Sequence, residues 1–269
     1  MLDCHIHTFR CGPGEGDFED YIDLGIKRKF RVLGFSEHAP FIHDQENRMT
    51  KQQMKDYFKK LAALRKKYSS NVLILAGLEV DYSVQGERFI REMLSGVKPD
   101  FILGAVHFVE NGRKTTPIWD FEKMQHPDSQ QAYFRQISRA ISSDIFDTIA
   151  HPELLLRTGI REELLANNFR EIIAQMIKKN TFYEINCSGL SKSIYSPDTG
   201  EMVPGGYLSH SNITWGHKRG LRFTIGSDCH NPHEMGKGID EMLEFAKNRD
   251  IQINYFNKRR STAYENSNN

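Results

Sequence analysis

Strand-like and helix-like segments alternate along this chain of 269 residues. The strand-like segments are short runs rich in β-branched and other apolar residues, and they cover residues 1–5, 32–36, 72–79, 101–107, 146–150, 181–187 and 222–228. Amphipathic stretches typical of helices lie near residues 17–29, 50–69, 85–95, 128–144, 161–180, 205–219 and 232–248. This alternation implies right-handed crossovers and a parallel sheet. Seven such units are enough to close into an α/β barrel resembling a TIM barrel.

Three of the expected helices have a recognisable cap. Each pairs an acceptor at the N-cap with a polar side chain three residues later: Asp17 with Asp20, Thr50 with Gln53, and Asp128 with Gln131. We therefore expect helices to begin at these points.

An open, doubly wound sheet is the alternative architecture. Such a sheet usually carries a glycine-rich phosphate loop after its first strand, but residues 12–16, Gly-Pro-Gly-Glu-Gly, have neither the GxGxxG nor the GxxxxGK[ST] spacing. We interpret them as a flexible turn. Because the length is near the roughly 250 residues of one α/β barrel, we expect a single domain over residues 1–257. Residues 258–269, which include the basic trio Lys258 to Arg260, are expected to form a polar, frayed tail.

The balance of charges excludes some kinds of partner. The chain has 36 Lys and Arg against 35 Asp and Glu, a net charge of +1, so no field of one sign is available to hold a long nucleic acid or an anionic membrane. No signal-peptide pattern and no apolar run of about 18 residues is present. The four cysteines are scattered, which fits reduced thiols. These features favour a cytoplasmic protein and leave its oligomeric state undefined.

Histidines and carboxylates stand where the strand-like runs stop. They are His5, His7, His38, Glu79, His107, His151, Asp228 and His230. Because the carboxyl ends of parallel strands converge on one face of a barrel, these eight side chains can meet in one pocket. Neutral imidazole suits Zn, Fe or Mn, and carboxylates can bridge two ions and offset their charge. The pattern predicts a site for two or three divalent metal ions.

Such a site can activate water for a hydrolytic reaction. Two or three cations a few Å apart can deprotonate a shared water and stabilise the leaving oxygen. The catalytic group would then be a metal-bound water held by the ligand cluster rather than a serine or cysteine. Arg157, six residues after His151, is a candidate clamp for a phosphate oxygen. The pattern therefore predicts metal-assisted hydrolysis, with a phosphate ester as one candidate substrate.

The order of these motifs resembles the PHP (polymerase and histidinol phosphatase) superfamily, and most closely its histidinol-phosphatase branch. The stretches that carry the resemblance are Phe35–Pro40, Glu184–Leu190 and Gly226–His230. The resemblance implies a distorted seven-stranded (β/α) barrel with a trinuclear site of Zn, Mn or Fe. It implies one ion held by His5, His7, Glu79 and Asp228, a second reached by Glu79 and bound by His107 and His151, and a third bound by His38 and His230.

The same resemblance implies a phosphomonoesterase that acts on L-histidinol phosphate in histidine biosynthesis. Two positions depart from the family pattern. Pro13 stands where a further histidine usually binds the third ion. The alternatives are that Glu15 or Asp17 substitutes, that a water completes the shell, or that the ion is weakly held. Ser191 stands where an Arg precedes Lys192, which leaves Lys192 as the candidate phosphate-binding residue beside Arg157. His43 and Ser188 are candidate substrate contacts.

Three other functions remain open from the sequence. A relative that cleaves nucleotides or short oligonucleotides is the nearest. An amidohydrolase-type C-N hydrolase also uses HxH on its first strand, but would not need Glu79 and His38 as further ligands. A non-catalytic metal-binding module is the third. Trp119 and Phe121 lie in a long stretch between strands, and they form either a lid over the pocket or a cover on the outside of the barrel, with the lid favoured.

Overall fold

The computed structural model of the protein describes residues 1–265. Seven strands form one parallel sheet in the order β1-β2-β3-β4-β7-β8-β11. Their bounds are β1 (Leu2–Ile6), β2 (Val32–Phe35), β3 (Leu73–Asp81), β4 (Phe101–Ala105), β7 (Thr148–Ile149), β8 (Phe182–Asn186) and β11 (Phe223–Gly226). The edges meet, because Asp228 N donates to His5 O at 2.8 Å and His7 N donates to Cys229 O at 3.0 Å. The predicted barrel is confirmed, and the open sheet is excluded.

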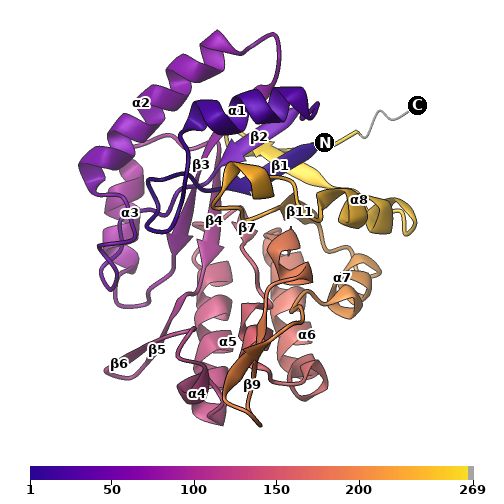
Figure 1. Cartoon of the computed structure of the whole chain (residues 1–269). Helices are drawn as coiled ribbons and strands as arrows, with labels where there is room; N and C mark the ends of the chain where they lie inside the picture. Colours follow the sequence, from indigo (N-terminus) through magenta and orange to yellow (C-terminus); the bar gives the residue numbers. More distant parts are fainter. Residues whose placement is uncertain (266–269) are drawn as a thin grey trace.

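Helices surround the sheet (Figure 1). They are α1 (Phe18–Lys27), α2 (Lys51–Lys67), α3 (Glu87–Ser95), α5 (Pro127–Ser142), α6 (Glu162–Lys179), α7 (His210–His217) and α8 (Ile239–Lys247). They fall within the amphipathic stretches of the sequence, except that α5 begins one residue before its predicted stretch. Every residue of β1, β2, β4 and β8 is buried, as expected for strands covered on both faces. In the described part of the chain, no helix is long and apolar enough to cross a membrane.

Two of the three predicted helix caps are confirmed. Asp17 and Thr50 both form capping boxes. The prediction at Asp128 is wrong, because α5 begins one residue earlier, at Pro127. Its cap is His126, whose Nδ1 accepts from the backbone N of Asp128 at 3.3 Å. A proline suits the first helical position, where no intrahelical bond to the backbone nitrogen is needed.

Short elements that the sequence did not indicate extend the barrel. They are the hairpins β5 (Phe108–Asn111) with β6 (Lys114–Pro117), β9 (Ile194–Ser196) with β10 (Glu201–Val203), and β12 (Asn254–Asn257) with β13 (Arg260–Ala263); helix α4 (Phe121–Met124); and the 3-10 helices η1 (Leu154–Thr158), η2 (Cys187–Leu190) and η3 (Pro232–Glu234). Hairpin β5-β6 follows β4 and hairpin β9-β10 follows β8, so both extend from carboxyl ends of barrel strands. They lie together with α4 in the lower part of the view (Figure 1).

The expected frayed tail is wrong for residues 258–265. Strand β13 pairs with β12, and Phe256 packs edge-on against Phe182 with ring centroids 4.8 Å apart. Arg259 Nε lies 2.6 Å from Asp147 Oδ2, so the basic trio is not simply solvated. The hairpin spans the boundary that the sequence placed after residue 257. Residues 266–269 lie outside the described residues.

Two glycines make room for one aromatic ring inside the barrel. A Cβ atom added to Gly77 would lie 2.2 Å from Cζ of Phe101, and one added to Gly34 would lie 3.0 Å from the same atom. Gly34 is on β2, Gly77 on β3 and Phe101 at the amino end of β4, so neighbouring strands share this packing. The ring fills the barrel beneath the strand ends that carry the polar residues.

Candidate metal centre

The structure brings all eight predicted residues to the carboxyl ends of the strands. His5 lies on β1 and His7 just past its end, so the alternation of a strand turns both side chains to the same side. Glu79 lies near the end of β3. The others follow strands β2, β4, β7 and β11 directly: His38, His107, His151, Asp228 and His230. Their convergence is what the strand-end pattern predicted, and their role as ligands stays a prediction.

The carboxylate of Glu79 lies between two sets of imidazoles. Its Oε2 lies 2.9 to 3.4 Å from three ring nitrogens, those of His5 Nε2, His7 Nε2 and His38 Nδ1. Its Oε1 lies 2.8 Å from His151 Nε2 and 3.8 Å from His107 Nε2. Glu79 is only 1% exposed. A buried carboxylate whose two oxygens face different sets of imidazoles is suited to bridge two cations.

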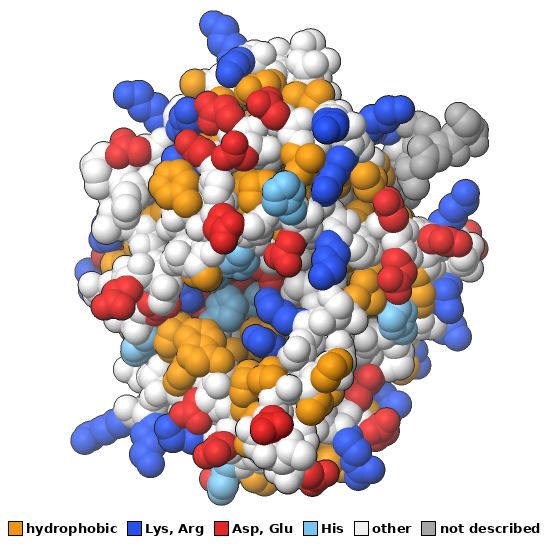
Figure 2. Space-filling model, viewed as in Figure 1, with side chains coloured by type: hydrophobic (Ala, Val, Ile, Leu, Met, Phe, Trp, Pro, Cys, Tyr) orange, Lys and Arg blue, Asp and Glu red, His pale blue; other side chains and the backbone are white. Residues whose placement is uncertain are grey.

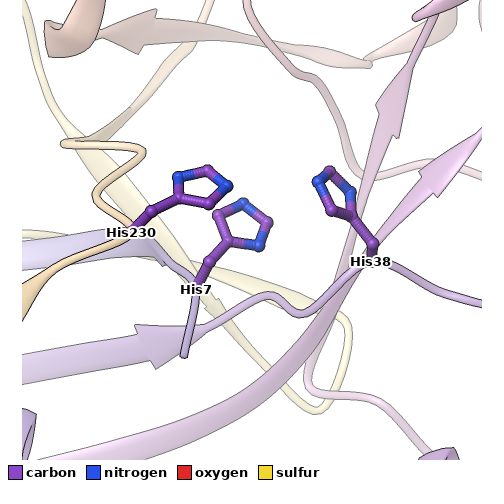
Figure 3. A group of neighbouring side chains, drawn as sticks. All are labelled: His7, His38 and His230. Carbon is purple, nitrogen blue, oxygen red and sulfur yellow. The ribbon is translucent and has the colours of Figure 1, made fainter. Parts of the chain in front are cut away.

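Asp228 and His230 complete the opposite side of the cluster. Asp228 Oδ1 lies 3.6 Å from His5 Nε2 and 3.5 Å from His7 Nε2. The rings of His7, His38 and His230 project into a common space, with the His7 ring between the other two (Figure 3). The centroid of the His7 ring is 4.5 Å from that of His38 and 4.4 Å from that of His230.

The donor atoms form groups that fit metal ions. Three groups have ligand atoms within 4.8 Å of one another: His5-His7-Asp228, His38-Glu79-His107 and His7-His38-His230. The Nε2 atoms of His5 and His7 face each other at 2.9 Å, and both side chains are fully buried. A cation placed among these buried nitrogens and the neighbouring carboxylates would satisfy both kinds of polar group. Imidazole with carboxylate is a donor set that suits Zn, Mn or Fe.

The outer nitrogens of three rings have partners that the sequence reasoning did not assign. Each partner holds Nδ1 and leaves Nε2 directed inward: Glu184 Oε1 for His5 at 2.5 Å, Asp81 Oδ1 for His107 at 3.1 Å, and Cys11 Sγ for His7 at 3.4 Å. Asp81 carried a signal in the sequence, since it is two residues after Glu79 and shares its side of β3. Nothing in the sequence indicated that Cys11 would reach His7.

The electrostatics of the cluster favour charged carboxylates, and they favour neutral imidazoles at His38 and His230. Burial raises the pKa of Glu79, but the imidazoles, His38 first, hold that pKa well below its usual value. Burial, together with Arg48, lowers the pKa of His38 well below its usual value. Burial, with His7 next, lowers the pKa of His230 to about 4. These are the protonation states in which imidazole and carboxylate bind metal ions.

His5, His7 and His107 differ from those rings, because burial lowers the pKa of each but neighbouring carboxylates raise it above the usual value. The effect at His5 is the most marked. Burial lowers the pKa of His5, but the carboxylates of Glu184, Asp228 and Glu79 together raise it well above the usual value. These three acids therefore favour positive charge at the position of His5. A metal ion held by His5 would supply that charge in place of the proton.

A cavity of about 560 Å³ opens over the cluster. Figure 2 shows the hollow near the middle of this face, with histidine at its floor and basic and hydrophobic side chains at its rim. Arg157 and Lys192 line it, as do Trp119 and Phe121. Arg157 Nε donates to Ser193 O at 3.1 Å, and its guanidinium lies 5.6 Å from the Phe121 ring centroid. The two aromatic residues thus border the cavity, which agrees with the lid interpretation rather than the outer cover.

A larger hollow, of about 750 Å³, lies elsewhere on the molecule. Arg65, Asp100 and Arg259 are among its lining residues, and it contains none of the predicted site residues. Asp100 directly precedes β4, so this hollow is at the amino end of the barrel. Active sites of such barrels lie at the carboxyl end, so the smaller cavity is the candidate site.

Three of the other predicted contacts are not brought into the cluster. The Glu15 carboxylate accepts from Asn231 Nδ2 at 2.6 Å, and Asp17 caps α1. Neither belongs to a metal-binding group among the described residues. His43 Nε2 lies 3.4 Å from Glu110 Oε1, and His43 is not among the residues that line the cavity in the described part of the chain.

Ser188 and Pro13 border the site. Ser188 Oγ donates to Asn186 Oδ1 at 2.6 Å, lies 3.3 Å from Asp228 Oδ2 and lines an adjoining hollow of about 570 Å³. Pro13 lines both hollows. Beneath it the thiol of Cys11 donates to Glu37 Oε2 at 2.6 Å, and these two residues form a further buried metal-binding group with His7.

The fold and the cluster define an α/β barrel with a candidate metal centre at the carboxyl ends of its strands. The model of the PHP domain family matches residues 3–188, which is more than half of the chain. The chain belongs to the PHP domain family.

Two curated relatives are similar over most of the chain. A protein of Deinococcus radiodurans named probable histidinol-phosphatase is 24% identical over 88% of each chain. The histidinol-phosphatase of Bacillus subtilis is 24% identical over 90% of this chain and 98% of its own. Among solved structures, the histidinol phosphate phosphatase of Lactococcus lactis, complexed with zinc, L-histidinol and phosphate, matches with a TM-score of 0.79. It is 17% identical over 97% of this chain and 98% of its own, which shows a shared fold.

Proposed function

We propose that this chain is a metal-dependent phosphomonoesterase that hydrolyses L-histidinol phosphate to L-histidinol and phosphate. The observation that carries the proposal is the Glu79 carboxylate between two sets of imidazoles, at the floor of a cavity lined by Arg157 and Lys192. The two curated relatives with histidinol-phosphatase names, each matched over most of its length, support this choice of substrate. The zinc, L-histidinol and phosphate bound by the structural relative point the same way.

The assignment of ligands follows the family resemblance, and it differs from the donor groups of the described residues, which place His38 beside Glu79 and His107 and do not include His151. His5, His7, Glu79 and Asp228 would hold one ion, Glu79 with His107 and His151 a second, and His38 with His230 a third. The third group contains His7 in place of the expected histidine at position 13, and no carboxylate. The resident ions would be Zn, Mn or Fe, and when bound they would activate a water and offset the charge on the phosphate.

The chain's own side chains would bind and enclose the substrate. Arg157 is held by Ser193 O and by the Phe121 ring, so its guanidinium is oriented before a phosphate arrives. Lys192 adds a second positive charge on the lining of the same cavity. Trp119 covers part of the mouth and reduces the access of bulk water. A cytoplasmic location, consistent with four free cysteines, is part of this proposal.

The first experiment compares substrates and metal content. We expect purified protein to contain two or more transition-metal ions per chain and to release phosphate from histidinol phosphate faster than from mononucleotides or short oligonucleotides. Chelation should abolish the activity, and added Zn or Mn should restore it. Faster release from nucleotides would contradict the proposed substrate, and full activity in metal-free protein would contradict the proposed chemistry.

A variant pair tests the cluster itself. His107→Ala removes one of the imidazoles that face Glu79 Oε1, so phosphate release should fall by several orders of magnitude. His210→Ala is the matched control, because His210 is exposed and lies at the start of α7. A non-catalytic metal-binding module, or an amidohydrolase-type enzyme that releases an amine, would release no phosphate before or after either change.

A further inference from the structure

Asp44 is an acid at the catalytic cavity that none of the assigned roles uses. It lies between β2 and α2 and lines the same 560 Å³ cavity as Glu79 and Arg157. Its side chain is only 12% exposed. Asp44 Oδ1 accepts from Asn47 N at 3.3 Å and from Asn47 Nδ2 at 3.1 Å, which holds the turn. Its Oδ2 accepts no hydrogen bond from the described residues.

The charges around Asp44 do not cancel. The closest cation is Arg48, whose Nε lies 3.6 Å from Asp44 Oδ2 while its Nη2 lies 2.8 Å from Asp81 Oδ2. One guanidinium thus serves two carboxylates, which leaves one formal negative charge. The Arg48 side chain is nearly buried, and Asp81 is committed to His107, so neither partner can turn to balance Asp44. A carboxylate oxygen in this position attracts a cation from the cavity.

The rest of the cavity indicates what that cation is attached to. Arg157, Lys192 and the metal-binding cluster provide the positive charge that a phosphate needs, and a phosphate would be repelled by Asp44. The volume is in the range of cavities that enclose one small ligand. The lining therefore fits a molecule with a phosphate at one end and a positively charged group at the other.

We propose that Asp44 binds the ammonium group of the substrate and so selects phosphomonoesters of amino alcohols. This inference rests on the proposed function, because histidinol phosphate carries an ammonium group on the carbon next to the one that bears the phosphate ester. The carboxylate of Asp44 accepts from the ammonium through Oδ2, while Oδ1 keeps its bonds to Asn47.

The test is the Asp44→Asn variant, assayed with two esters. One is L-histidinol phosphate, and the other is 3-(imidazol-4-yl)propyl phosphate, which has the same ring and phosphate but no amine. Asparagine retains the Oδ1 acceptor for Asn47 and removes only the charge. The ratio of kcat/KM between the two esters should fall by about 10- to 100-fold, the size expected for a hydrogen bond between charged groups. Glu46→Gln, an exposed acid in the same turn, is the control and should leave that ratio unchanged.

Several outcomes would overturn the inference. An unchanged ratio in Asp44→Asn, with histidinol phosphate still hydrolysed, removes Asp44 as the selecting residue and leaves the proposed function intact. No hydrolysis of histidinol phosphate by the wild-type protein overturns both. Calorimetry on the wild-type protein needs no variant: it should bind L-histidinol more tightly than the amine-free alcohol, and equal affinities would also refute the inference.

Discussion

Replacing Glu184 with Gln should weaken metal binding without unfolding the barrel. Glu184 is buried in the middle of β8, and its two oxygens have different partners. Oε1 accepts from His5 Nδ1 at 2.5 Å, while Oε2 accepts from the backbone N of His151 at 2.8 Å and from Asn186 Nδ2 at 3.0 Å. The carboxylate therefore accepts from three donors, a task that an amide of the same size cannot repeat.

The two orientations of the new amide differ in where the free-energy cost falls. With the amide oxygen toward His5, the NH2 group faces two buried donors, and leaving both unpaired costs about 2–6 kcal/mol of stability. With the amide flipped, both donors are satisfied, but the NH2 group donates to His5 Nδ1 and moves the ring proton to Nε2. That tautomer cannot bind a metal ion. The flipped state is the cheaper one for folding, so the loss should appear as metal affinity, by about 10- to 100-fold or about 1.4–2.7 kcal/mol.

The assay is competition for Zn against a coloured chelator, together with denaturant unfolding of the metal-free protein. We expect weaker Zn binding in Glu184→Gln and a free energy of unfolding close to that of the wild-type protein. Glu201→Gln, at an exposed glutamate of β10, is the matched control for loss of one negative charge. Wild-type Zn affinity combined with reduced stability would refute the reasoning, because it would place the role of Glu184 in folding alone.

Three further predictions concern stability and the ligand set. Chelation should lower the unfolding temperature of the protein as isolated, since ions held at 100 times their Kd stabilise the native state by about 2.7 kcal/mol per site; an unchanged temperature would contradict a native metal centre. Gly77→Ala should destabilise the barrel by about 1–3 kcal/mol, because its Cβ would lie 2.2 Å from Cζ of Phe101. Adding Phe101→Leu to that variant should recover part of the loss in denaturant unfolding. Asp17→Ala should cost about 1 kcal/mol through loss of the α1 cap and leave the metal content unchanged; a loss of metal would restore Asp17 as a ligand.

The barrel could be predicted from the sequence because strand-like and helix-like segments alternate regularly along the chain. The strands are largely buried on both faces and are therefore mostly apolar, with uninterrupted apolar runs at β2 and β4 and buried polar residues such as Glu184 in β8. Each strand-like run is followed by an amphipathic stretch. The hairpins gave no such signal. Strand β9 has only three residues and β6 is polar, so neither shows a recognisable alternation. A frayed tail was predicted from residue 258 onward because the polar composition of this segment gives no sign that β13 pairs with β12.

The candidate ligands could be predicted because topology alone places the ends of parallel strands together. Their supporting residues could not, because those contacts depend on the paths of loops. Cys11 reaches His7 only because residues 8–14 fold back on themselves, with Gly14 N donating to Cys11 O and Cys11 N to Thr8 O. Arg48 comes from a loop between β2 and α2 and meets Asp81 of β3, a pairing that no spacing in the sequence encodes.

The closure of the barrel and the assembly of the candidate metal centre both depend on the junction between the first strand and the last. His5 and His7 belong to the first strand, while Asp228 and His230 follow the last, more than 220 residues away. Buried Asp3 ties the two edges, since its Oδ1 accepts from Ser227 N at 2.9 Å and its Oδ2 from Ser227 Oγ at 2.5 Å. An ion held by His5, His7 and Asp228 would also link these two edges of the sheet, so its binding would favour the closed barrel. The substrate cavity lies over that junction, and we therefore infer that metal binding and the shape of the cavity are coupled.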